Sequence, residues 1–267
     1  MNILSKLKSR SKTKKKIGLV LSGGAARGFA HVGVIKALNE HGIYPDIVSG
    51  VSAGAIAGVL YCDGHEPDEM LQIIKDRSLF KYASITIPRN GLLSIENMQK
   101  VLTDALHAKT FDELKIPFYC TATNLNKGTA EYFHKGELVP RLIASASIPV
   151  LFKPMELDGI TYVDGGVADN FPVKPLEGKV DKIIGVHVNP TGEEKEIKGL
   201  IKIAERTFHI SVNSRINEMA NNCDLFIQPE KLKKFNLLSV SEGRNIFEVG
   251  YEKAMEVLDK TNTKQFK

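Results

Sequence analysis

The first part of the chain alternates between short apolar runs and stretches with helical periodicity. Residues 17–21 are apolar and end at Ser22-Gly23-Gly24, and residues 29–39 then place apolar side chains at helical spacing. A second apolar run at 47–49 leads through a glycine-containing pentapeptide into an alanine-rich stretch that reaches about residue 62. This β-α-β-α order predicts an α/β fold with a mainly parallel central sheet and helices on both faces.

The remaining elements follow from the same periodicities and from turn residues. Between about residues 67 and 114 the pattern is helical with interruptions: Ser94 suits the N-cap of a helix running to His107, and 84–91 is predicted to be a loop. Further on, we expect strands at 118–122, 130–133, 161–163, 182–188 and 225–227, and helices at 138–146, 196–221 and 242–260. No internal repeat or linker interrupts this series, so residues 17–267 are predicted to form a single domain.

The net charge of +5 belongs to one end of the chain. Residues 1–16 contain seven of the 36 basic residues and no acid, which leaves 29 basic against 31 acidic residues in the remainder. We therefore expect a basic, disordered tail at residues 1–16 and no nucleic-acid partner. The cations of the tail interleave with Ile3, Leu4 and Leu7, a composition suited to peripheral contact with an anionic membrane; a merely solubilising tail is the alternative.

Cysteine usage and the length of the apolar runs indicate the compartment. The three cysteines are odd in number and lack C-x-x-C spacing, which argues against a disulfide framework or a structural zinc site. The longest uncharged stretch, the sixteen residues between Asp46 and Asp63, is too short to span a membrane, and residues 17–22 do not resemble a secretory signal. These features predict a cytoplasmic protein with, at most, peripheral contact at the inner face of the membrane.

The pentapeptide Gly50-Val51-Ser52-Ala53-Gly54 fits the pattern G-x-S-x-G at a predicted strand-to-helix turn. Glycines on both sides let the backbone turn sharply, so Ser52 should stand exposed at the positive end of the following helix. This context indicates a nucleophilic serine, whereas the pattern alone also fits a glycine-rich turn with a solvated serine.

The loop after the first strand offers consecutive small residues whose N–H groups can point into one cavity and stabilise an oxyanion. The residues predicted to form this oxyanion hole are Gly23, Gly24, Ala25, Ala26, Arg27 and Gly28. A dinucleotide-binding loop is the rival interpretation, but it requires an acid about twenty residues on, where Val51 and Ser52 stand. No Gly-Lys-Ser/Thr follows the glycines, which argues against a Walker loop. We expect no cofactor and no metal.

A nucleophilic serine also needs a general base, and histidine is the usual choice. His187 lies in an apolar strand, His209 in a helical stretch and His134 at the end of a hairpin strand. His31 lies one helical turn after the glycine loop, where it is expected to support that loop. None of the four occupies a position typical of a catalytic histidine.

Asp164 is the alternative base. It follows a short strand and precedes Gly165-Gly166, which can bend the chain and hold the carboxylate out at the end of the sheet. A carboxylate placed there can accept the serine proton directly. Taken alone, Asp-Gly-Gly also fits an ordinary turn.

Three blocks of the sequence together resemble the patatin-like phospholipases. They are the loop 23–28 followed by His31-Val32-Gly33, the pentapeptide 50–54, and Asp164-Gly165-Gly166 followed by Asn170-Phe171-Pro172, with the segment 144–149 resembling the stretch before the aspartate block. The resemblance covers residues 17–190. It implies a three-layer sandwich and a histidine-free Ser-Asp dyad in which Ser52 is the nucleophile and Asp164 the general base.

The same resemblance implies that the amides of residues 23–28 form the oxyanion hole and that Arg27 helps to shape the loop. One departure is Ala25, where the family has glycine. Alanine still donates its N–H, so the hole survives unless this position requires a positive φ.

The implied activity is that of a serine acyl hydrolase of the lysophospholipase or phospholipase A type, working through an acyl-enzyme on lipid esters. A carboxylesterase or thioesterase on soluble acyl substrates would use the same residues. A histidine-assisted hydrolase or acyltransferase and a non-catalytic, membrane-associated regulatory protein are further alternatives. The intact serine, aspartate and glycine loop argue against the last of these.

Overall fold

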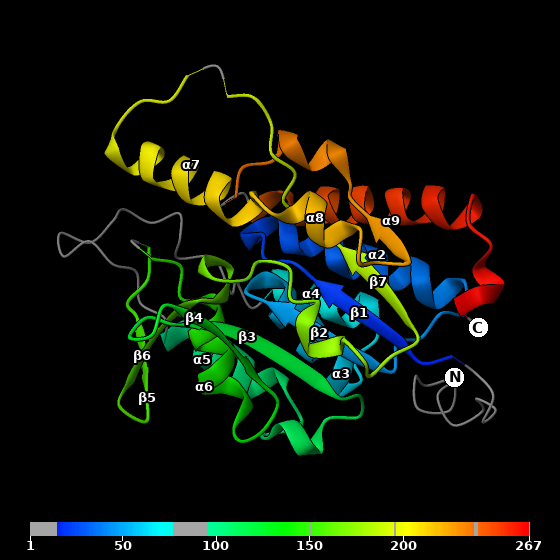
Figure 1. Cartoon of the computed structure of the whole chain (residues 1–267), viewed down its shortest axis with the longest axis horizontal. Helices are drawn as coiled ribbons and strands as arrows, with labels where there is room; N and C mark the ends of the chain where they lie inside the picture. Colours follow the sequence, from blue (N-terminus) through cyan, green and yellow to red (C-terminus); the bar gives the residue numbers. More distant parts are fainter. Residues whose placement is uncertain (1–14, 77–95, 150, 195, 238–239, 267) are drawn as a thin grey trace.

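The computed structural model describes residues 15–76, 96–149, 151–194, 196–237 and 240–266. Within these residues an eight-stranded sheet has the order β5-β6-β3-β2-β1-β7-β8, with β4 also paired to β3 (Figure 1). The strands are β1 Ile17–Leu21, β2 Ile47–Val51, β3 Phe118–Asn124, β4 Thr129–Phe133, β5 Met155–Leu157, β6 Ile160–Asp164, β7 Lys182–Val186 and β8 Leu225–Ile227. The strands β3, β2, β1, β7 and β8, in this order across the sheet, are parallel to their neighbours. Strands β4 and β6 each pair antiparallel with β3, and β5 pairs antiparallel with β6. The predicted mainly parallel sheet is confirmed.

The described helices surround this sheet. They are α2 Phe29–Glu40, α3 Ala53–Asp63, α4 Pro67–Asp76, α5 Glu96–Ala105, α6 Leu138–Ala146, α7 Leu200–Asn213, α8 Ile216–Ala220 and α9 Gly243–Asp259. Short 3-10 helices are η1 Ala25–Gly28, η3 Phe111–Glu113, η4 Gly165–Val167, η5 Lys174–Leu176, η6 Glu230–Lys234, η7 Val240–Glu242 and η8 Thr263–Phe266.

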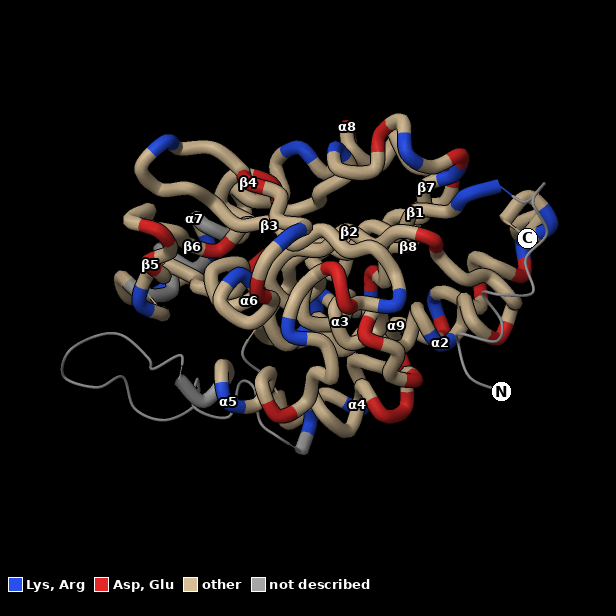
Figure 2. The backbone as a smooth tube through the Cα atoms, turned by 90° about the horizontal axis from the view of Figure 1, so that it is seen from below, with Lys and Arg blue, Asp and Glu red and all other residues tan. Residues whose placement is uncertain are grey.

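The two faces of the sheet are covered unequally. On β1, the side chains of Ile17, Leu19 and Leu21 enter the main core, which α2, α3 and α9 cover. The side chain of Val20 enters a smaller cluster on the other face, formed with Phe171 and its neighbours near η5 and partly buried residues of α8. Figure 2 shows α8 on one side of the strands and α2, α3 and α9 on the other, with α4 and α5 farther out. The molecule is therefore a three-layer sandwich with one thin layer.

Most predicted elements are confirmed, and the differences have local causes. The expected helix over 196–221 is divided, because α7 ends at Asn213 and α8 begins at Ile216. The hairpin strand β5 was missed, since three residues are too few to show alternation. The helix expected to reach His107 ends at Ala105, and its predicted N-cap Ser94, like the loop 84–91 and the tail 1–14, lies outside the described residues.

Charged residues of both signs are interspersed over the folded body (Figure 2). This distribution agrees with the nearly balanced charge of residues 17–267.

Candidate active site

Ser52 lies in the sharp turn between β2 and α3, as predicted. Its backbone angles are φ 52° and ψ −123°, a strained conformation for a residue other than glycine. The turn is tightly packed, because a Cβ on Gly54 would lie 2.4 Å from the Leu21 carbonyl oxygen. Ser52 thus stands at the N-terminal end of α3, where the helix dipole favours negative charge.

The expectation that Ser52 is exposed is wrong, since only 5% of the residue is accessible. Elements distant in sequence close over the turn. A Cβ on Gly23 of the glycine loop would lie 3.5 Å from the Ser52 Cβ, and Ser145 contacts the turn from α6. Burial of the hydroxyl strengthens every electrostatic interaction that it makes.

Helix α6 connects the two catalytic candidates. The backbone N–H of Ser52 donates a hydrogen bond of 2.8 Å to the Oγ of Ser145, which is fully buried. Immediately after the helix, the carbonyl of Ser147 accepts a 2.8 Å hydrogen bond from the N–H of Asp164. Both serines lie in the segment 144–149, and the sequence alone assigned them no role.

Asp164 ends strand β6 and is the N-cap of η4. Its Oδ1 accepts a 2.8 Å hydrogen bond from the N–H of Gly166, and the carboxyl lies close enough to the Ser52 side chain for that side chain to lower its pKa. Gly165 must be a glycine here, because its Cβ would lie 2.2 Å from the Thr121 carbonyl oxygen. The turn therefore holds the carboxylate at Ser52, although at 3% exposure it is buried and not held out from the sheet.

Burial dominates the electrostatics of Asp164. Desolvation raises the pKa of its carboxyl to about 6, against the hydrogen bonds from Ser52 and Gly166, which lower it. A carboxylate with a pKa near neutrality both ionises at physiological pH and accepts a proton readily, which is what a general base requires.

The glycine loop has fewer backbone N–H groups available to bind an oxyanion than the sequence predicted. The N–H of Gly23 bonds to the Asn170 carbonyl at 3.3 Å, that of Ala26 to the Leu237 carbonyl at 2.9 Å, and that of Arg27 to the Gly24 carbonyl at 3.0 Å. Within the described part of the chain, no acceptor engages the N–H of Gly24 or of Ala25. Gly28 is the last residue of the 3-10 helix η1, whose internal hydrogen bonding uses its N–H, so the candidate oxyanion donors are narrowed to Gly24 and Ala25.

Ala25 adopts φ +47°. A positive φ is the one requirement under which an alanine in place of glycine was expected to disturb the oxyanion hole. The left-handed region costs a residue with a Cβ roughly 1–2 kcal/mol. The hydrogen bond from Ala26 to Leu237 and the 3-10 helix η1 hold the loop in this shape. The loop therefore keeps the Ala25 N–H in place, although the backbone at Ala25 is strained.

The four histidines considered as bases bond elsewhere. The Nε2 of His31 lies 2.8 Å from the Ser22 carbonyl oxygen, and burial lowers the pKa of His31 to about 3. His187 bonds to Asn213 and Gln228, His209 to Asn189, and His134 is exposed beside the Tyr132 carbonyl. The geometry gives no support to a histidine-assisted triad, and His31 supports the glycine loop as expected.

A buried polar network behind the loop was missed. Arg27 donates through Nε to the Phe235 carbonyl at 3.0 Å and through Nη1 to Oδ1 of Asn189 at 2.9 Å. The Nε2 of His209 lies 2.8 Å from the same Oδ1, and Nδ2 of Asn213 donates to the His209 carbonyl at 2.7 Å. Arg27 thus joins the loop to α7, as its expected shaping role requires. These residues are too far apart in sequence to form a recognisable motif.

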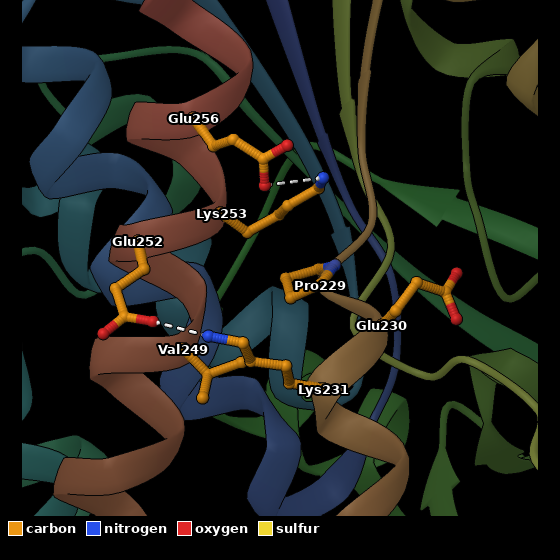
Figure 3. A pocket seen from close by; sticks show the side chains of 7 residues that line it. All are labelled: Pro229, Glu230, Lys231, Val249, Glu252, Lys253 and Glu256. Carbon is orange, nitrogen blue, oxygen red and sulfur yellow. Dashed lines mark hydrogen bonds and ion pairs between the residues drawn. The ribbon is translucent and has the colours of Figure 1, made fainter.

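A surface hollow between α9 and residues 229–231 is a separate feature (Figure 3). Its charged side chains pair with one another: Lys231 with Glu252 at 3.0 Å, and Lys253 with Glu256 at 3.1 Å. It shares no lining residue with the surroundings of Ser52, and its charges are unsuited to an acyl chain. Among the described residues, no helix has the length and apolar character needed to cross a bilayer.

The fold and the site together define a class of protein: an α/β protein with a buried serine at a strand-to-helix turn, a hydrogen-bonded carboxylate and a glycine loop beside it. The sequence matches the patatin-like phospholipase family model over residues 19–177. The chain therefore belongs to the patatin-like phospholipases, a family of hydrolases acting on ester bonds, and the recognition made from the three blocks is confirmed.

Curated relatives carry related descriptions. An uncharacterized NTE family protein of Mycobacterium bovis is 32% identical over 186 residues, covering 68% of this chain and 52% of that protein. Lysophospholipase NTE1 of Mycosarcoma maydis is 28% identical over 275 residues, covering 91% of this chain and 15% of that protein. This chain thus spans about half or less of the length of these relatives.

Solved structures support the fold. VipD from Legionella pneumophila superposes with a TM-score of 0.59 at 17% identity, covering 97% of this chain and 73% of that chain. Human GIVD cytosolic phospholipase A2 superposes with a TM-score of 0.53 at 10% identity, covering 99% of this chain and 62% of that chain. The predicted patatin-like architecture is confirmed.

Proposed function

We propose that this chain hydrolyses acyl esters of lipids, as a lysophospholipase or phospholipase A, with Ser52 as the nucleophile and Asp164 as the general base. The observation that carries the proposal is the proximity of these two buried side chains: the Ser52 side chain acts on the Asp164 carboxyl, whose pKa burial raises to about 6. Membership of a phospholipase family supports the lipid part of the proposal.

In the first half of the reaction, Oγ of Ser52 attacks the ester carbonyl carbon and Asp164 accepts the hydroxyl proton. The oxyanion is stabilised by the N–H groups of Gly24 and Ala25, assisted by the N-terminal end of α3. The intermediate collapses, the C–O bond to the alcohol breaks, and Asp164 returns the proton to the departing alcohol. An acyl-Ser52 ester remains.

In the second half, Asp164 removes a proton from a water molecule that attacks the acyl carbon. A second oxyanion forms at the same amides and collapses, releasing the fatty acid, and Ser52 recovers its proton from Asp164. The carboxylate is ionised at the start of each half-reaction, so a pKa below the working pH is essential.

Exposed apolar side chains support a lipid substrate. Most large apolar side chains that are exposed in the described residues lie in one segment: Ile197, Leu200, Ile203 and Ile210. The C-terminal end of α7, at Ser211 and Val212, lines a small hollow together with residues 166–171, so this end of the helix neighbours the turn after Asp164. A helix that reaches the site at one end and exposes apolar side chains along its length suits contact with aggregated lipid.

The basic tail is proposed as a second, electrostatic contact with the inner face of an anionic membrane. Each cation near such a surface contributes about 1 kcal/mol, so binding should be reversible and sensitive to salt. Co-sedimentation with anionic and neutral vesicles at low and high salt, for the full chain and for a chain starting at Ile17, tests this. Equal binding by both chains would refute the role of the tail.

The proposed activity is tested by labelling with a serine-reactive fluorophosphonate and by assays on lysophospholipids, diacyl phospholipids, short p-nitrophenyl esters and acyl-CoA. We expect Ser52→Ala to lose both labelling and hydrolysis, whereas Ser49→Ala, at a buried serine of the preceding strand β2, keeps both. If the chain preferred short esters or acyl-CoA, its substrate would be a soluble acyl compound and not a lipid. Absence of labelling in the wild-type chain would identify a non-catalytic protein.

A further inference from the structure

Three metal-ligating side chains converge where α3 ends. Asp63 is the last residue of α3, and its Oδ2 lies 3.2 Å from Nε2 of His65 and 2.9 Å from Nδ1 of His107. The three ligand atoms all lie within 4.8 Å of one another. His107 comes from the segment after α5, so the cluster joins two parts of the chain that are 42 residues apart in sequence.

The carboxylate of Asp63 is oriented before any ligand binds. Its Oδ1 accepts a 3.0 Å hydrogen bond from the N–H of Ala108, and its Oδ2 accepts one of 2.8 Å from the N–H of His107. These two bonds come from the backbone, so they fix the direction of the carboxylate oxygens independently of the histidine side chains.

His65 is a buried histidine with a carboxylate near each of its ring nitrogens. It is 3% exposed, and while its Nε2 faces Asp63, its Nδ1 lies 3.0 Å from Oε1 of Glu69. A carboxylate on the far nitrogen of an imidazole orients the ring and strengthens it as a ligand, and it is a common partner of zinc-bound histidine. The carbonyl oxygen of Ala105, 3.2 Å from the same Nε2, is a fourth potential ligand.

We propose that Asp63, His65 and His107 bind a zinc ion, with Glu69 supporting His65. Ligand atoms about 2.1 Å from a tetrahedral zinc lie roughly 3.4 Å apart, so the two separations from Oδ2 of Asp63 differ from this by only a few tenths of an ångström. Imidazole and carboxylate together suit zinc, and three protein ligands leave a fourth position for water or a carbonyl.

The site would be structural. Helix α3 begins directly after Ser52 and spans 11 residues, so its two ends are separated by about 16 Å. Zinc would fasten the end of this helix to the segment after α5 without reaching the serine. The expectation of no metal rested on the cysteines, which have no part in this cluster.

The rival arrangement has no metal. In it, His65 is protonated and held between two carboxylates; the hydrogen bond to Asp63 raises its pKa, against burial. Both arrangements use the same atoms. Only the metal site would take up one zinc per chain, and that uptake would require His107.

The experiment is a zinc titration of the full chain, stripped with EDTA, against a chromogenic chelator at pH 7.5. We expect one zinc per chain for the wild type and at least about 100-fold weaker binding for His107→Ala, a variant that should fold because its side chain is 71% exposed. Glu69→Gln should weaken binding by about 10–100-fold. His134→Ala, the matched control at an exposed histidine elsewhere, should bind as the wild type does.

Two further readouts make the result decisive. Saturating zinc should raise the Tm of the wild type and not that of His107→Ala, and cobalt(II) in the site should show tetrahedral d–d absorption. Ester hydrolysis should be equal for the wild type and His107→Ala. Failure of the wild-type chain to take up stoichiometric zinc, or undiminished uptake by His107→Ala, would overturn the proposal while leaving Ser52 and Asp164 untouched.

Discussion

The backbone N–H of Ser52 is bonded to the hydroxyl of Ser145, 93 residues later in the chain. This bond satisfies a buried donor within the strained turn, and it comes from the helix whose following residue Ser147 also binds Asp164. One short helix therefore sets the positions of both proposed catalytic residues.

Ser145→Ala should lower the free energy of unfolding by about 1–3 kcal/mol, because the buried N–H of Ser52 loses its acceptor. The turn would also relax, and a displacement of the nucleophile can lower kcat by up to about 10²-fold. Ser49→Ala is the control: Oγ of Ser49 is buried and has no hydrogen-bond partner in the described structure, so its loss should cost little. Chemical denaturation and ester kinetics measure both effects, and equal behaviour of the two variants would contradict the assignment.

The pH dependence of hydrolysis should report Asp164. Since the ionised carboxylate is the base and its pKa is about 6, kcat/KM should rise with pH through that value and level off above it. Asp164→Asn should lose about 10² to 10⁴-fold in rate and the ascending limb with it. Asp169→Asn, at a second buried carboxylate that is bonded to Tyr132, should retain the limb. A limb unchanged in Asp164→Asn would assign it to another group.

The same carboxyl should destabilise the fold when it ionises. Its pKa is about 6 in the folded protein against an ordinary value of 3.8, so the folded state holds the proton more tightly and stability falls as pH rises from about 4 to 6. Above pH 6, Asp164→Asn should be the more stable protein by up to about 3 kcal/mol, and the difference should shrink toward pH 4. Denaturation of both proteins across this range checks the sign, and a gap that widens on acidification would refute it.

Ala25→Gly should stabilise the fold. Glycine removes the cost of about 1–2 kcal/mol for a left-handed alanine, but its greater freedom in the unfolded chain costs roughly 0.4–1 kcal/mol, so the net gain in the free energy of unfolding is about 0–1.6 kcal/mol. Ala26→Gly, one residue on and at negative φ, should instead destabilise. The Tm of each variant, measured by thermal unfolding, tests both expectations. A loss of stability in Ala25→Gly would mean that the loop is not strained.

The apolar side chains of α7 should matter only for aggregated substrate. Leu200 and Ile203 are three residues apart and share one face of the helix, with 82% and 49% exposure. Burial of such a side chain is worth about 1.5–3 kcal/mol, so replacing both by serine should weaken vesicle binding at least about tenfold. Hydrolysis of lysophospholipid in vesicles should fall, while that of a soluble short ester stays constant. Leu125→Ser, at an exposed leucine after β3, is the control; equal losses on both substrates would indicate a folding defect.

Local sequence patterns were sufficient to predict several secondary-structure elements of this protein and the places of two site residues. The apolar run 17–21, the helix at 138–146 and the strand 225–227 are found with their predicted bounds, because each is a short element bounded by turn residues and marked by a clear periodicity. The positions of Ser52 and Asp164 at strand ends were also predictable, since glycines beside each of them allow the turn. Side-chain type and near neighbours contain this information.

Only the tertiary structure decided how these pieces act on one another. Hydrogen bonds from Ala26 to Leu237 and from Arg27 to Asn189 join residues more than 150 positions apart, and no local pattern encodes such partners. The sequence predicted an exposed serine, but packing of the glycine loop and α6 around the turn buried it, and burial in turn moved the pKa of Asp164 to about 6. Residue identity is a property of the chain, whereas desolvation depends on everything that folds around a group; the chemistry at Ser52 and Asp164 was therefore set by the fold.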